Sequence, residues 1–112
     1  MPFIQITTNQ TVDKEAEILL EISKLAAEKL GKPERYVMTA LHSSIPMTFD
    51  GKDELAAFVD CKSIGLSQDK VKSISEALCT YLEEELAIPA DRIYIDFSDA
   101  KGSMWGYNKS TF

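Results

Sequence analysis

The sequence has few of the residues that build metal centres and disulfide frameworks. Its 112 residues include two cysteines and one histidine. Cys61 and Cys79 belong to no C-x-x-C pair, so we expect reduced thiols packed within the fold rather than a redox centre. Together with His42 they lack the short ligand spacings of a structural zinc site. We therefore predict neither a metal ion nor a cofactor.

Positive charge and long apolar runs are also scarce. The chain carries 12 basic and 18 acidic side chains, a formal net charge of -6. Binding to a phosphate backbone requires the opposite sign, which argues against nucleic acid as a partner. No apolar run approaches the roughly 18 residues that cross a membrane, and the first residues lack the basic and apolar regions of a signal peptide. We expect a cytoplasmic protein without a membrane partner.

What the sequence does contain is the composition of a folded protein. Hydrophobic residues make up 45% and charged residues 27% of the chain, which is typical of globular domains. A chain of this length buries roughly two thirds of its unfolded surface, enough for a core without disulfides. We expect one domain over residues 1–112, in which residues 2–43 and 57–99 form an internal repeat and residues 100–112 a C-terminal tail.

The first half of this repeat predicts a strand, a helix and a second strand. Phe3–Thr7 is rich in β-forming residues, and Thr11 is suited to cap a helix. The apolar residues of that helix recur at helical spacing: Leu19, Ile22, Ala26 and Leu30. Gly31 and Pro33 end the helix, and residues 36–41 resume as a strand.

The second half follows the same plan. Residues 55–64 predict a strand, Ser67 caps a helix, and residues 92–97 form the last long strand. The apolar residues of this helix are Val71, Ile74, Leu78 and Leu82. Pro33 and Pro89, half a chain length apart, hold equivalent places.

Two β-α-β units in one chain predict an α+β fold with internal pseudo-symmetry. Because crossovers between parallel strands are right-handed, both helices should lie on one face of a four-stranded sheet. Such a sheet has open edges, which proteins cover or pair with another subunit. Residues 47–49 and 104–112 remain outside the two units and are suited to short edge strands that reach a neighbouring chain. We expect an oligomer.

The last strand places a phenol and a carboxylate on its outer face. Tyr94 and Asp96 alternate with aliphatic residues that point toward the helices. They form either a solvated surface or the polar wall of a pocket, and the pattern alone leaves both alternatives open.

Pro2 is a second candidate for chemistry. Removal of an initiator methionine, which is normal before a small residue, exposes its secondary amine. An α-amino group titrates near about 8, and burial lowers that pKa toward the range suited to proton transfer at neutral pH. The alternative is structural, since a proline without an N–H is tolerated at the start of a strand.

Five short motifs help to decide whether Pro2, Tyr94 and Asp96 have a functional or a structural role. They are residues 1–4 (MPFI), 31–36 (GKPERY), 63–65 (SIG), 89–95 (PADRIYI) and 108–112 (NKSTF). In this order, on a doubled β-α-β chain, they resemble the macrophage migration inhibitory factor family of the tautomerase superfamily over essentially the whole length.

The resemblance implies a homotrimer with an active site at each subunit boundary, and keto–enol tautomerisation of an aryl 2-oxo acid such as phenylpyruvate. It makes Pro2 the catalytic base, Lys32 the cation for the substrate carboxylate, and the backbone amide of Ile64 a further contact. Other implied substrate-binding residues are Phe3, Tyr36, Tyr94, Asp96, Trp105, Tyr107 and Phe112. A neighbouring subunit contributes Tyr94 and Asp96.

Departures from the family pattern change these expectations. Asp96 stands where animal members typically carry Asn, and an anion there favours the protonated amine of Pro2. Residues 56–59 lack the C-x-x-C of some members, so thiol oxidoreductase activity is not expected. Lys62 and the bulky Trp105 alter the expected substrate preference.

Two other functions fit the same resemblance. The first is a cytokine-like effector with a protein receptor and a vestigial pocket, exported by an unconventional route. The second is a small-molecule sensor that binds without turnover. Ketonisation of phenylpyruvate separates an enzyme from both.

Overall fold

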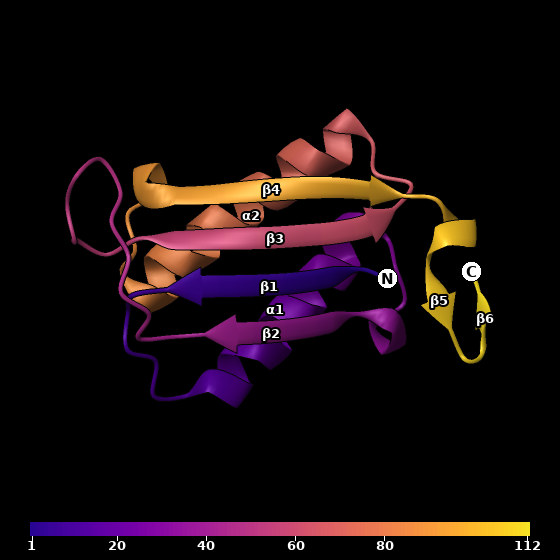
Figure 1. Cartoon of the computed structure of the whole chain (residues 1–112), viewed down its shortest axis with the longest axis horizontal. Helices are drawn as coiled ribbons and strands as arrows, with labels where there is room; N and C mark the ends of the chain where they lie inside the picture. The colour runs from indigo at the N-terminus through magenta and orange to yellow at the C-terminus, as the bar shows by residue number, and fades with distance from the viewer.

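The computed structural model describes the whole chain, Met1 to Phe112, as a four-stranded sheet with two helices on one face (Figure 1). Its main elements are β1 (Phe3–Thr8), α1 (Glu15–Leu30), β2 (Met38–His42), β3 (Ala57–Ile64), α2 (Gln68–Leu86) and β4 (Ile93–Ala100). The shorter ones are the 3-10 helices η1 (Glu34–Tyr36), η2 (Ala90–Arg92) and η3 (Gly102–Met104), and the strands β5 (Gly106–Tyr107) and β6 (Ser110–Thr111). The predicted α+β fold of two pseudo-symmetric units is confirmed.

The strand order β2-β1-β3-β4 joins the two units through their first strands. Within each unit the strands are parallel, whereas β1 and β3 are antiparallel, with Phe3 opposite Lys62. The beginning of β1 therefore lies beside the end of β3. This pairing brings the chain terminus next to the Ser63–Gly65 motif.

The hydrophobic core fills the space between the helices and one face of the sheet. Alternate residues of β1 and β3, such as Ile4 and Val59, are fully buried there, as expected for strands with one covered face. The predicted helix faces are confirmed except at Leu19 and Val71, which are only half-buried. Ile18 and Leu86 extend the two buried faces. No helix of the structure has the length and apolar character to cross a membrane.

Local signals set most of the helix ends. The hydroxyl of Ser67 accepts a hydrogen bond from the Lys70 amide at 3.2 Å and caps α2. Gly31 ends α1 in the left-handed conformation, with φ 64°, as glycine allows. The predicted Thr11 cap is wrong, because α1 begins four residues later and Thr11 Oγ1 instead lies 3.2 Å from Ser44 Oγ.

Three strand boundaries differ from the prediction by two or more residues. Tyr36 belongs to η1, so β2 begins at Met38, and β3 begins at Ala57 rather than residue 55. β4 continues to Ala100, past the predicted end at residue 97. In both halves a proline immediately precedes the short 3-10 helix, and this turn delays the following strand.

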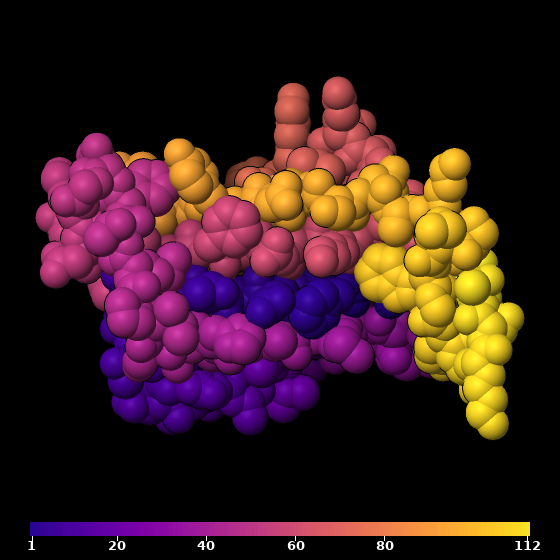
Figure 2. Space-filling model, in the orientation of Figure 1, coloured from indigo at the N-terminus to yellow at the C-terminus, as the bar shows by residue number.

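Within one chain, neither segment outside the repeat pairs with the four-stranded sheet, so edge strands that reach a neighbouring chain stay a prediction. Residues 47–49 contribute only an isolated bridge between Phe49 and Lys52. The C-terminal tail folds on itself as the β5–β6 hairpin. Both central residues of its turn, Asn108 and Lys109, have positive φ (51° and 66°), the conformation that matches the twist of a two-residue hairpin. The hairpin lies at the end of the sheet where the chain begins (Figures 1 and 2).

Candidate functional site

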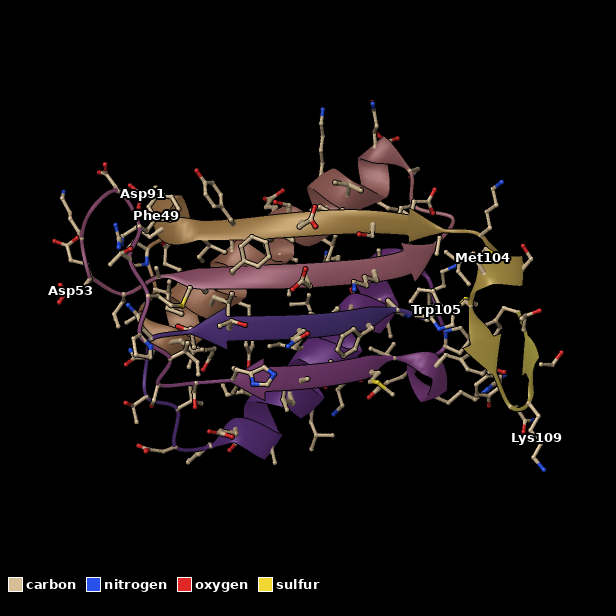
Figure 3. The ribbon with its side chains drawn as sticks, in the orientation of Figure 1. Phe49, Asp53, Asp91, Met104, Trp105 and Lys109 are labelled. Atoms are coloured by element: carbon tan, nitrogen blue, oxygen red, sulfur yellow. The ribbon has the colours of Figure 1, made fainter.

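A cavity of about 230 Å³ lies at the amino end of β1. Its walls come from the chain terminus, η1, the start of β2 and the C-terminal tail. The lining residues are Met1, Pro2, Phe3, Arg35, Tyr36, Val37, Met38, Trp105, Gly106, Tyr107 and Phe112. Figure 3 shows Trp105 between the tail and the beginning of β1. Six predicted site residues therefore meet here: Pro2, Phe3, Tyr36, Trp105, Tyr107 and Phe112.

Three of these residues form an aromatic wall. The Tyr36 ring meets the rings of Tyr107 and Phe112 edge-on, with centroids 5.6 and 5.5 Å apart. Tyr107 and Phe112 stack on each other at 4.9 Å. Mutually packed rings of this kind present a fixed apolar surface to a planar ligand group.

The tail closes in a way that holds Phe112 in this wall. The Phe112 amide donates a hydrogen bond to the Trp105 carbonyl at 3.1 Å. At Gly102, an added Cβ would lie 3.0 Å from the Phe112 carbonyl oxygen. A side chain at position 102 would therefore push the last residue away, so the close approach requires glycine.

The terminal amine lies in surroundings that favour its neutral form. The chain described here retains Met1, so the nitrogen of the fully buried Pro2 is part of a peptide bond. The Met1 amine donates a hydrogen bond to the Tyr36 carbonyl at 2.8 Å. Burial, and then the positive charge of Lys32, lower the pKa of this amine below its ordinary value of 8.0.

Lys32 and Ile64 lie near the terminus without lining the cavity. Lys32 is half-buried in the turn after α1, where its charge acts on the terminal amine. Ile64 is the last residue of β3, two residues after Lys62, which pairs with Phe3. The two residues therefore come to the region of the terminus from different elements.

Tyr94 and Asp96 are not brought to this site by their own chain. Their positions in β4 pair with Phe58 and Asp60, which pair in turn with Thr7 and Gln5 of β1. From strand spacing and rise, their Cα positions lie about 19 and about 14 Å from that of Pro2. Tyr94 instead contacts Phe49, with ring centroids 4.8 Å apart, at the opposite end of the sheet from Trp105 (Figure 3).

The sequence interpretation missed two residues beside the terminus. Arg35 lines the cavity, with its guanidinium 4.8 Å from the centroid of the Tyr36 ring. Ser63 is fully buried, its hydroxyl has no hydrogen-bond partner, and it directly follows Lys62, which pairs with Phe3. Both belong to motifs that had been singled out, and strand alternation would have put Ser63 on the covered face.

The cysteines offer no alternative chemistry. Burial raises the pKa of the Cys61 thiol to about 11 and also raises that of Cys79, which keeps both thiols protonated and weakly nucleophilic at neutral pH. Both are free thiols. No group of three or more His, Cys, Asp or Glu side chains is placed to hold a metal ion.

Paired β-α-β units with a cavity at the chain terminus, lined by a proline at position 2, define a protein of the tautomerase superfamily. The family model "Macrophage migration inhibitory factor (MIF)" matches residues 1–112. The chain therefore belongs to the macrophage migration inhibitory factor family.

Individual relatives agree with this assignment along the whole chain. A macrophage migration inhibitory factor homolog of Trichuris trichiura is 40% identical over 114 residues, covering all of both chains. The macrophage migration inhibitory factor of Xenopus tropicalis is 35% identical and covers all of this chain and 99% of its own. A crystal structure of the homologue from Prochlorococcus marinus superposes with a TM-score of 0.94, at 46% identity and 98% coverage of both chains.

Proposed function

We propose that this chain, after removal of Met1, catalyses keto–enol tautomerisation of an aryl 2-oxo acid such as phenylpyruvate, with the terminal amine of Pro2 as general base. One observation carries the proposal: the chain terminus lies in a cavity where burial and Lys32 lower the pKa of an amine. A neutral amine accepts protons, and a base is most effective when its pKa is near the working pH.

The chemistry needs few groups. In enolisation the amine of Pro2 takes a proton from C3 of the substrate, the C–H electrons form the C2–C3 double bond, and the carbonyl oxygen takes a proton from water. The protonated amine then gives its proton back to water, and in ketonisation the same steps run in reverse, with the protonated amine of Pro2 giving a proton to C3. Lys32 and the Ile64 amide hold the carboxylate, which keeps C3 close to the base. The wall of Tyr36, Tyr107 and Phe112 suits the aryl ring of such a substrate.

The same proposal includes a homotrimer with sites between subunits. The sheet face away from the helices is uncovered in one chain (Figure 2), and it exposes 65% of Met38, 62% of Tyr94 and 39% of Phe58. Apolar side chains gathered on one face favour an interface. In a trimer, Tyr94 and Asp96 of one copy reach the site of another. Light scattering should give three times the chain mass of 12.5 kDa.

The test is ketonisation of enol-phenylpyruvate by protein whose loss of Met1 is verified by mass spectrometry. Protein with an acylated terminus should lose at least about 100-fold in rate, because it lacks the amine that transfers the proton to and from C3. Pro2→Gly should lose about tenfold or more, since a primary amine remains but the ring that fixes its direction is gone. Pro46→Gly, the same change in an exposed loop, should leave the rate unchanged.

Turnover that survives acylation would contradict the proposal. If the processed protein folds and assembles but has no activity, the alternative of a cytokine-like effector with a protein receptor gains support.

A cytoplasmic location is also part of this proposal, and fractionation of the producing cells tests it.

A further inference from the structure

Two cationic side chains lie at or near one small cavity in an acidic protein. The chain has a formal net charge of -6, yet Lys32 lies close enough to the terminus to lower the amine pKa. Arg35, three residues further on, is the one charged side chain among the eleven residues that line the cavity, eight of which are hydrophobic. One carboxylate of a substrate accounts for Lys32. Phenylpyruvate offers no second anionic group for Arg35 to bind.

The position of Arg35 is set by the aromatic wall. Its guanidinium lies over the Tyr36 ring at 4.8 Å, and Tyr36 is held in turn by Tyr107 and Phe112. A guanidinium stacked on a ring keeps the N–H groups at its edge free to donate. Those donors match the two oxygens of a carboxylate. The arrangement fits an anion at the rim of the cavity, beyond the aryl ring.

We infer that Arg35 determines specificity for a 2-oxo acid carrying a second anionic group, a carboxylate on the far side of the aryl ring. The inference rests on the proposed function, in which Lys32 takes the first carboxylate and Pro2 the C3 proton. Because the whole protein repels a dianion at long range, the selection depends on contact between the second carboxylate and Arg35.

The experiment compares two substrates that differ only in this group, the enols of phenylpyruvate and 4-carboxyphenylpyruvate, with Met1-free protein. Arg35→Gln should lower kcat/KM for the carboxylated substrate by roughly 5- to 10-fold, mainly through KM, as for an exposed charge-assisted hydrogen bond. Phenylpyruvate should change less than about twofold. Arg35→Lys should recover part of the loss, since it keeps the charge but not the paired donors.

Two controls separate local contact from general charge. Lys29→Gln removes the same charge from an exposed position on α1, outside the cavity lining, and should leave the substrate preference intact. Raising the ionic strength should reduce the preference of the unaltered protein and leave that of Arg35→Gln unchanged.

Binding gives a readout that does not need turnover. Trp105 is the sole tryptophan and lines the cavity, so its fluorescence reports occupancy by 3-(4-carboxyphenyl)propionate or 3-phenylpropionate. The inference is supported if the protein binds the diacid more tightly than the monoacid and Arg35→Gln loses this difference in affinity. It is supported even if neither enol is turned over, and in that case only the proposed function fails. The inference would be overturned if Arg35→Gln weakened the binding of both ligands equally, or changed the binding of neither. Turnover of phenylpyruvate is measured separately and still tests the proposed function.

Discussion

The terminal amine is the residue on which the proposed chemistry depends, and its surroundings act on it in one direction. Burial and the positive charge of Lys32 both disfavour the protonated form, so both lower its pKa. The amine is held by a hydrogen bond to the Tyr36 carbonyl at 2.8 Å. In a chain that has lost Met1, we expect the same surroundings to act on Pro2. Under the proposed function, catalysis and carboxylate binding are then coupled through Lys32.

Lys32→Met should raise the pKa of the Pro2 amine, because it removes the like charge and leaves only burial to lower the pKa. The rising limb of the pH profile of kcat/KM for enolisation should move to higher pH. The pH dependence of the rate of acylation of the amine should show the same shift. Lys32→Arg keeps the charge and should leave both profiles in place. A profile that stays unchanged in Lys32→Met would contradict the assigned effect of Lys32.

At the scale of elements, Arg92 holds together the loop between β2 and β3. It is only 8% exposed, and its side chain donates hydrogen bonds to backbone carbonyls of that loop. The acceptors are Leu55 at 2.8 Å, Phe49 at 3.0 Å, Glu54 at 3.0 Å and Lys52 at 3.3 Å. The guanidinium also lies 5.2 Å from the centre of the Phe49 ring, which contacts Tyr94. The loop therefore supports the residue that we propose a neighbouring site uses.

Arg92→Met should lower the free energy of unfolding by about 2–4 kcal/mol, because four partly buried carbonyls lose their shared donor. Urea denaturation followed by circular dichroism measures this change. Lys52→Met, in the same loop but exposed, should stay within about 0.5 kcal/mol. Equal, small effects of both substitutions would show that the hydrogen bonds of Arg92 are replaced by water.

At the scale of the whole molecule, the uncovered face of the sheet carries Tyr94 and Asp96, which we propose act in the site of a neighbouring copy. Asp96 lies there beside Asp60 of the neighbouring strand, about 14 Å from the Pro2 of its own chain by strand geometry. Any effect of Asp96 on the terminal amine must therefore pass between copies. The pH dependence of the reaction thus reports on assembly.

Asp96→Asn should move the rising limb of the pH–rate profile for enolisation to lower pH. Removing an anion near the amine destabilises its protonated form, which lowers the pKa of Pro2. Asp91→Asn, an exposed change of equal charge in η2, serves as the control. Light scattering must show the same oligomer for all three proteins. An unchanged profile in an intact trimer would rule out coupling between Asp96 and Pro2.

Most of the fold could be predicted from the sequence because its signals are local. Strand alternation, helical spacing and the caps at Ser67 and Gly31 each depend on a few neighbouring residues. The Thr11 cap failed because its hydroxyl instead lies beside Ser44, 33 positions away in the chain. The sequence interpretation missed that the tail pairs with itself in the β5–β6 hairpin, whose turn is formed by Asn108 and Lys109.

The sequence by itself determined the two β-α-β units, the order of their elements and a proline at position 2, just before the first strand. Only the tertiary structure decided which residues surround that proline. The antiparallel register of β1 with β3 and the folding of the tail bring Arg35, Trp105 and Phe112 to one cavity and leave Tyr94 and Asp96 outside it. Contacts between residues so far apart in the chain follow from packing and strand pairing, which local patterns do not encode.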